Sequence, residues 1–136
     1  MNFEILSAMP TPKEYVELRA LVGWGEVDLE VASKGLERSL FNVSARLGSR
    51  LVGMGRVVGD GAMFFYIQDL VVAPEFQNKG LGKRLMDQIE IYISQVAVKG
   101  ATVGLFSAQG KESFYMRYEY IKRTGEDLGL GMCKFI

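Results

Sequence analysis

The sequence predicts a mixed α/β fold in which helices cover a sheet, and three observations lead to this prediction. Residues 43–72 form apolar segments separated by Gly-containing turns, which is typical of three strands in a meander. The pattern changes to a helical period over residues 80–96. Hairpins between the first strands exclude a doubly wound sheet, since that fold needs helical crossovers between parallel strands. With 136 residues and no linker or repeat, we expect one domain over residues 1–136.

Two helices are expected before the meander. Residues 2–6 alternate weakly, as in a first strand. Thr11 and Glu14 have the spacing of a capping box, so a helix is expected to begin there. Asp28 can cap a second helix. Glycines flank Trp24 on both sides, which predicts a loop between the two helices.

The elements of the meander and of the remaining chain follow from turns and periodicity. Gly48 and Ser49 form a two-residue hairpin turn. The strand over residues 63–72 is almost continuously apolar, which predicts a central position covered on both faces. Gly100 ends the helix of residues 80–96. We then expect a strand over 101–106, a short helix over 111–118, and one or two last strands within 120–136.

The composition excludes several classes of protein. Sixteen Lys and Arg balance 16 Asp and Glu, which argues against nucleic-acid binding and against docking on an anionic membrane. No histidine is present and Cys133 is the sole cysteine, so Cys/His zinc sites, Ser-His-Asp triads and internal disulfides are excluded. The N-terminus has no signal-peptide pattern and no apolar stretch is long enough for a bilayer, so a cytoplasmic protein is expected.

The segment of residues 77–84 carries the strongest chemical signal. It joins a buried strand to an amphipathic helix and has the sequence Gln-Asn-Lys-Gly-Leu-Gly-Lys-Arg. Free amides at a helix start favour an anion, and glycines allow a ligand to approach the backbone. Arg84 stands where a Walker A loop needs Ser or Thr, and Leu85 stands where a dinucleotide fingerprint needs Gly. The segment therefore predicts a pyrophosphate site of another kind.

Residues 77–82 match the pattern [QR]-x-x-G-x-[GA], and this segment resembles the acetyl-CoA loop of the GNAT superfamily of N-acetyltransferases. Residues 69–76 resemble the strand that precedes the loop in this superfamily, and residues 114–120 resemble its F-Y-x-x-x-G-F block. The resemblance covers roughly residues 43 to 120. Two departures are Ala108, where members often have Asn, and Glu119, where they have Gly.

The resemblance implies a fold and a cofactor. The fold is a mixed, mostly antiparallel sheet, splayed at its centre and flanked by helices on both faces. Acetyl-CoA would be the acetyl donor, with its pantetheine arm in the gap of the sheet and its pyrophosphate on the loop. No metal is implied. The cofactor-binding residues implied are Leu70, Val71, Val72, Gln77, Asn78, Lys79, Gly80, Leu81, Gly82, Lys83 and Arg84.

The resemblance also implies a reaction, in which a neutral amine attacks the thioester directly in a ternary complex. Tyr115 matches the general acid that protonates the departing thiolate, and the amide of Val72 is a candidate oxyanion donor. Asp69 is the candidate base, with two alternatives: a structural acceptor role for Asp69, and a water chain that removes the proton. Strand alternation allows only one of Gln68 and Asp69 to face the acceptor, unless a bulge intervenes.

The acceptor is expected to be the primary amine of a small molecule, and the enzyme an N-acetyltransferase. Trp24, Tyr66 and Gln68 are the residues expected to bind it. A protein or peptide acetyltransferase and a non-catalytic acyl-CoA-binding module remain as alternatives. The identity of the amine and the oligomeric state, with a homodimer as one option, stay open.

Overall fold

The computed structural model describes residues 2–136, which divide into two compact units that separate after Leu105. The first unit contains the sheet and three helices of eight residues or more. The second unit, Phe106–Ile136, contains one short helix. Each unit is described by itself below.

The first unit is built on a five-stranded sheet in the order β1-β2-β3-β4-β5. The first four strands pair antiparallel, and β5 pairs parallel with β4, so the sheet is mixed and mostly antiparallel, as predicted. The hairpin turn expected at Gly48 and Ser49 joins β2 to β3. The strands are β1 (Phe3–Leu6), β2 (Phe41–Leu47), β3 (Arg50–Gly59), β4 (Phe64–Val72) and β5 (Thr102–Leu105).

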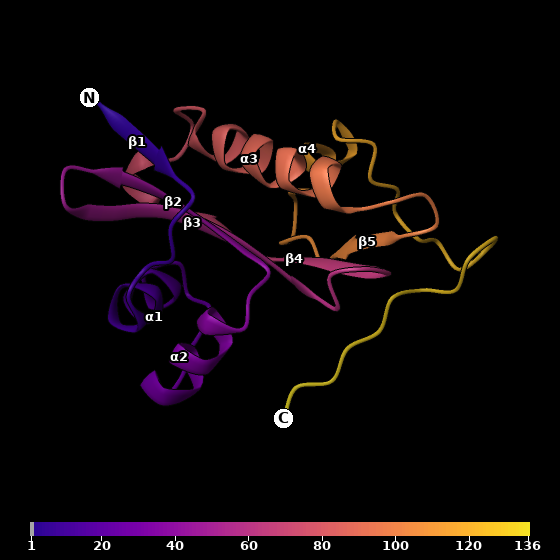
Figure 1. Cartoon of the computed structure of the whole chain (residues 1–136), viewed down its shortest axis with the longest axis horizontal. Coiled ribbons are helices and arrows are strands. Elements are labelled where there is room, and N and C mark those ends of the chain that lie inside the picture. The colour runs from indigo at the N-terminus through magenta and orange to yellow at the C-terminus, as the bar shows by residue number, and fades with distance from the viewer. Residues whose placement is uncertain (1) are drawn as a thin grey trace. The chain divides into compact units, whose positions relative to one another are not determined.

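Helices cover both faces of this sheet (Figure 1). The helices α1 (Pro12–Leu21) and α2 (Leu29–Glu37) lie on one face, and α3 (Leu81–Val96) lies on the other. Both predicted N-caps are confirmed. Thr11 and Glu14 form a complete capping box, and the Asp28 carboxylate accepts from two amides of the first turn of α2. The local sequence therefore sets where each of these helices begins.

The core between α3 and the sheet depends on two glycines of β3. One face of α3 is buried, and a Cβ added at Gly53 would lie 3.0 Å from Leu85 Cδ1. A Cβ at Gly55 would lie 3.0 Å from Ile89 Cδ1. Larger residues at these positions would push the helix away, because so short a distance is overpacked. Close packing of α3 fixes the helix start that follows β4.

The strand β4 extends beyond the end of its partner β5. Pairing with β5 spans Phe64 to Ile67, and β5 ends at Leu105. Within residues 68–72 of β4, Gln68, Val71 and Val72 pair with β3 alone, and we call the other side of this segment the unpaired edge of β4. This unpaired edge begins where β5 ends, and β5 is the last strand in the sheet order.

A β-bulge interrupts the pairing of β4 with β3. The register passes from Met54 opposite Val71 to Arg56 opposite Gln68, so β4 contains one more residue than β3 in this interval. Asp69 within the bulge has a φ of 58°, in the left-handed region that side chains other than glycine rarely adopt. A bulge of this kind can turn two successive side chains to one face.

The second unit begins with an aromatic cluster around α4 (Glu112–Met116). The Phe114 ring lies edge-on to Tyr115 at 5.1 Å between centroids, and Tyr115 lies edge-on to Tyr120 at 6.4 Å. Glu119 has a φ of 70°, so this position has the left-handed backbone that glycine favours even though a glutamate occupies it.

The last strands predicted in residues 120–136 are wrong for the described chain, where no strand follows Leu105. Residues 121–136 are exposed throughout. A strand forms when a neighbouring backbone supplies hydrogen bonds, and alternation of side chains alone does not provide that partner.

Candidate active site

The turn from β4 to α3 places the predicted cofactor loop. A short 3-10 helix, Pro74–Phe76, follows β4, and the buried ring of Phe76 anchors it in the core. The side chain of Gln77 then reaches back, and its Nε2 donates to the carbonyl oxygen of Val72 at 2.9 Å. The first residue of the loop motif is therefore bound to the end of β4.

The loop backbone leaves the start of α3 open. Asn78 and Gly80 both have positive φ, of 62° and 82°. Gly80 is the N-cap of α3, and no side chain caps the helix. A Cβ at Gly80 would meet no atom within 4 Å, so the space beside it is open. Amides of an uncapped first turn, together with the positive end of the helix dipole, favour an anion at this place.

Positive side chains surround this helix start. Lys79, Lys83 and Arg84 are exposed, and the Lys83 Nζ lies 2.8 Å from the Asp87 carboxylate one turn later. An anionic diphosphate would meet the amides first and these cations around them. The uncapped turn, the left-handed loop and the unpaired edge of β4 fit the pyrophosphate and the amide-containing arm of acetyl-CoA.

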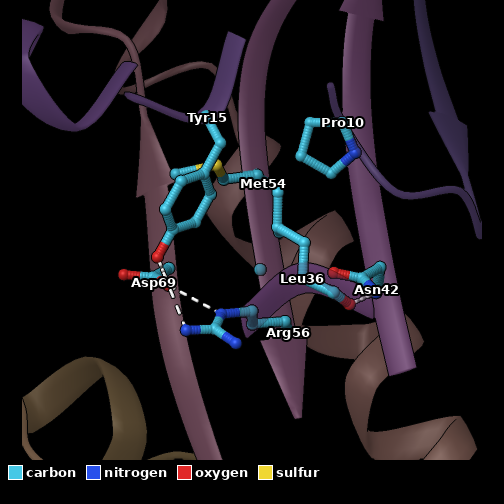
Figure 2. Close-up of a pocket in the computed structure, with 8 residues that line it drawn as sticks. Pro10, Tyr15, Leu36, Asn42, Met54, Arg56 and Asp69 are labelled. Atoms are coloured by element: carbon cyan, nitrogen blue, oxygen red, sulfur yellow. Dashed lines mark hydrogen bonds and ion pairs between the residues drawn. The ribbon is translucent and has the colours of Figure 1, made fainter. Parts of the chain in front are cut away.

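Asp69 lies at the centre of a polar cluster on the face of the sheet that carries α1 and α2 (Figure 2). Its Oδ2 accepts from Tyr15 Oη at 2.5 Å and from Arg56 Nε at 2.8 Å. Its Oδ1 accepts from Arg19 Nη1 at 2.6 Å and from Gln68 Nε2 at 3.0 Å. We call these five residues the Asp69 cluster. They come from α1, β3 and β4, so the carboxylate joins three elements.

The Asp69 side chain is almost fully buried, with 1% of its surface exposed. Burial raises the pKa of the Asp69 carboxyl, but hydrogen bonds from Tyr15 and Arg56 outweigh burial and hold this pKa below its ordinary value. Burial and the Asp69 charge raise the pKa of Tyr15. For Arg56, burial acts to lower the pKa, but the hydrogen bond to Asp69 reverses this and the pKa is raised.

These surroundings make Asp69 a poor proton acceptor. Both oxygens already accept two hydrogen bonds, and the crevice beside them is too narrow for a water molecule. The crevice is drawn in Figure 2, where the Tyr15 hydroxyl points toward Asp69. The role of Asp69 as general base stays a prediction, and this geometry favours the alternative, a structural acceptor.

The structure brings two of the predicted acceptor-binding residues to the Asp69 cluster. Gln68 belongs to it, and the bulge places Gln68 and Asp69 on one face, which strand alternation alone would not allow. Trp24 lies in the loop between α1 and α2, where its carbonyl oxygen accepts from Arg19 Nη2 at 3.2 Å. The Arg19 guanidinium also lies 5.7 Å from the Trp24 ring centroid. Tyr66 lies two residues before Gln68 on β4 and is half-buried.

Tyr115, the predicted general acid, belongs to the second unit. It lies in α4 with its ring half-buried among the aromatic side chains described above. Its catalytic role stays a prediction. Ala108, in the same unit, is exposed.

Sequence reasoning missed three members of the Asp69 cluster. From the sequence, no site role is assigned to Tyr15, Arg19 or Arg56. One signal was present: Arg56 is the one charge inside β3, after Arg50 at its start, and Asp69 is the one charge in β4. Buried charges of opposite sign in neighbouring strands predict an ion pair, because an unpaired charge is costly to bury.

Two other kinds of feature are absent from residues 2–136. Within residues 2–136, no group of three or more Asp, Glu or Cys side chains is arranged to hold a metal ion. No helix in this range combines the length and apolarity needed to cross a membrane.

Comparisons with known sequences identify the family. The family model described as an acetyltransferase (GNAT) domain matches residues 23–132. The uncharacterized N-acetyltransferase ycf52 of Porphyra purpurea is 32% identical over 113 residues, which cover 80% of this chain and 64% of that protein. The chloroplastic GCN5-related N-acetyltransferase 1 of Arabidopsis thaliana is 35% identical over 100 residues, which cover 71% of this chain and 49% of that protein.

A solved structure agrees with this result. A protein of unknown function from meticillin-resistant Staphylococcus aureus, described as a probable acetyltransferase, superposes with a TM-score of 0.89 at 32% identity. The match covers 98% of this chain and 100% of that one. The chain belongs to the GNAT acetyltransferase family, and the resemblance and the fold class predicted from sequence are confirmed. It spans 64% or less of the length of the two curated relatives above.

Proposed function

We propose that this protein is an acetyl-CoA-dependent N-acetyltransferase that acts on the primary amine of a small molecule. One observation carries the proposal. The uncapped start of α3, with its left-handed loop, directly follows the unpaired edge of β4. The uncapped start of α3 suits a diphosphate, and the unpaired edge of β4 suits an extended arm that contains amides. Acetyl-CoA contains both groups. The family match spans both units, which supports a single domain over residues 1–136.

The chain's own residues have separate tasks in binding the cofactor. Backbone groups of Leu70 and Val71 on the unpaired edge pair with the arm, as in strand addition. The Val72 carbonyl already accepts from Gln77, and in this proposal the Val72 amide faces the ligand. The pyrophosphate is held by the loop and the first turn of α3, through Gln77, Asn78, Lys79, Gly80, Leu81, Gly82, Lys83 and Arg84.

Bound acetyl-CoA supplies an activated acyl carbon and a thiolate leaving group. In this proposal Tyr115 Oη donates the proton that the leaving sulfur needs, since a phenol with an ordinary pKa of about 10 is matched to a thiol of about 8.5. The Val72 amide offers a hydrogen bond to the developing oxyanion. The proton of the incoming ammonium leaves through water, because Asp69 is saturated with donors.

The acceptor is proposed to bind on the side of β4 that faces α1 and α2. Gln68 and Tyr66 offer polar groups from β4, and Trp24 is an exposed aromatic ring in the adjoining loop, with 36% of its surface accessible. The protein is proposed to work in the cytoplasm without a metal, nucleic acid or membrane. Sedimentation of the purified protein decides whether it forms a homodimer.

The test is a screen of an amine library with acetyl-CoA, with detection of the released thiol. We expect turnover with at least one small-molecule amine, and mass spectrometry of that product should show an acetylated nitrogen. A protein that acetylates only peptides would contradict the small-molecule acceptor. A protein that binds acetyl-CoA without releasing thiol from any amine or peptide would be a binding module, and the enzymatic proposal would be withdrawn.

A further inference from the structure

Asp69 combines an uncommon backbone conformation with a fully hydrogen-bonded side chain. Asp69 lies in the β4 bulge with a φ of 58°. This conformation costs an L-residue roughly 1 kcal/mol or more, and it persists where the surroundings over-determine it. Here four side chains hold the Asp69 conformation in place through four hydrogen bonds. The cluster therefore holds the bulge in addition to the pairing of β4 with β3.

The same carboxylate reaches the loop that carries Trp24. Arg19 binds Asp69 through Nη1 and the Trp24 carbonyl through Nη2, and its guanidinium lies over the Trp24 ring, 5.7 Å from the centroid. A second connection runs through Arg56, whose Nη1 donates to the Gly35 carbonyl of α2 at 3.0 Å. Both arginines have side chains only 16% exposed. Without Asp69, two half-buried cations would lose the counter-charge that they share.

We propose that Asp69 is a positioning residue, which acts through Arg19 to fix Trp24 against the bulge of β4. This inference rests on the proposed function, because it concerns the acceptor side of that same site. Asp69 neither touches the acceptor nor accepts its proton. It sets the distance between the Trp24 loop and Gln68, so its loss weakens binding of the amine more than it slows the transfer step.

The chain offers a matched control for the effect of an ion pair between α1 and the sheet. Arg46 of β2 binds the Glu14 carboxylate of α1 through both Nη atoms, at 2.6 and 2.9 Å. This pair also ties α1 to the sheet, and the Arg46 guanidinium donates to Glu14 and to the Ser49 carbonyl, which lie outside the Asp69 cluster. A change of Arg46 tests whether any loosening of α1 disturbs the site.

The first experiment compares Arg19→Lys with Arg46→Lys. Lysine keeps the charge but lacks the fork that binds two acceptors at once. Trp24 is the only tryptophan, so the emission of the protein reports this loop alone. We expect Arg19→Lys to shift the emission and to raise the acceptor KM about tenfold, the equivalent of one charge-assisted hydrogen bond. Arg46→Lys should change neither, and kcat should stay within about twofold in both variants.

The second experiment separates positioning from base catalysis with Asp69→Asn. The positioning role predicts a higher acceptor KM, a shifted Trp24 emission and a pH–rate profile of wild-type shape. A base at this position predicts a large loss of kcat at unchanged KM, with loss of the acidic limb of the profile. If Asp69→Asn does not fold, Tyr15→Phe removes a single donor and should shift the emission in the same direction.

The emission of Trp24 needs no turnover, so this inference and the proposed function can fail separately. Absence of turnover and of acetyl-CoA binding in the wild type would end the proposed function. Equal emission and equal acceptor KM in Arg19→Lys and Arg46→Lys would overturn the positioning role. So would an Asp69→Asn variant that loses kcat at an unchanged acceptor KM.

Discussion

Two regions at the end of β4 differ in whether the protein itself supplies hydrogen-bond partners for their polar groups. In the Asp69 cluster, a buried carboxylate receives four hydrogen bonds from the protein itself, and the crevice between Asp69 and Leu36 is too narrow for a water molecule. At the start of α3, an exposed loop holds backbone in positive φ and leaves the helix uncapped. Polar groups that the protein satisfies itself stabilise the site, whereas those left to solvent are available to a ligand.

Asp69 and the loop of residues 77–82 are close in the sequence but differ in their roles. Asp69 and the loop of residues 77–82 both belong to the segments that resemble the family. The structure supports a ligand role for the loop and a structural role for Asp69. Substitutions in the two regions should therefore differ in what they change. Loop variants should lose the cofactor, and cluster variants should lose the fit of the acceptor.

The largest effect is expected from Gly82→Asp. The side chain would place a negative charge in the first turn of α3, where the proposal places the pyrophosphate. We expect turnover to disappear at acetyl-CoA concentrations that saturate the wild type, as measured by thiol release. Gln95→Asp adds the same charge on an exposed position near the other end of α3. If both variants lose turnover equally, the charge acts on the fold and not on a cofactor site.

The next largest effect is expected from Tyr115→Phe. Only a hydroxyl is lost, and its proposed work occurs in the transition state, so kcat should fall about 10²-fold while acetyl-CoA affinity holds. The basic limb of the pH–rate profile should flatten or move. Tyr118→Phe, in the same aromatic cluster, is the control and should keep wild-type kcat. A Tyr115→Phe variant with reduced stability but unchanged kcat would identify Tyr115 as a packing residue.

A smaller effect, on stability alone, is expected from Glu14→Gln. The hydrogen bond from Arg46 lowers the pKa of Glu14 to about 2. A lowered pKa means that the stabilisation is present above the ordinary value of 4.5 and is lost as pH falls toward 2. Both side chains still meet water, so we expect Glu14→Gln to cost about 1 kcal/mol at neutral pH.

Urea titrations of Glu14→Gln and the wild type at several pH values measure this difference. It should shrink between pH 4.5 and pH 2. Glu17→Gln is the control on the same helix, because Glu17 lies 4.0 Å from Lys13 with most of its surface exposed. A difference for Glu14→Gln that stays constant over this pH range would contradict the assigned ion pair.

The smallest effect, and one of opposite sign, is expected from Glu119→Gly. Glu119 has a φ of 70°, where glycine has no steric penalty. We expect a gain of about 0.5 kcal/mol in the free energy of unfolding, after the entropy of the more flexible unfolded chain is subtracted. Glu126, which has no positive φ, provides the control, and Glu126→Gly should stabilise nothing. A destabilised Glu119→Gly variant would contradict a strained turn at this position.

The sequence predicted those parts of the fold that local signals determine. The capping box at Thr11, the turn at Gly48 and Ser49 and the helical period after Gly80 each depend on residues a few positions apart, and each was confirmed. The loop motif was recognisable because its glycines and cations all lie within residues 79–84. Strands predicted in residues 120–136 failed because a strand needs a distant partner.

The Asp69 cluster could not be predicted for a related reason. Its contacts join residues 13, 50 and 54 positions apart, and only the folded sheet brings them together. The bulge that turns Gln68 and Asp69 to one face depends on the pairing of β4 with β3. Strand alternation alone predicts that only one of Gln68 and Asp69 faces the acceptor side. The bulge removes this restriction, and both side chains lie on one face.

The central claim is that the loop of residues 77–82 binds acetyl-CoA, and thermal melting measures it directly. A ligand at about 100 times its Kd should stabilise the wild type by about 2.7 kcal/mol, which corresponds to a rise of roughly 10 °C in Tm. We predict this rise for the wild type and for Gln95→Asp, and no rise for Gly82→Asp. An equal rise in all three proteins would place the acetyl-CoA site elsewhere and contradict the account.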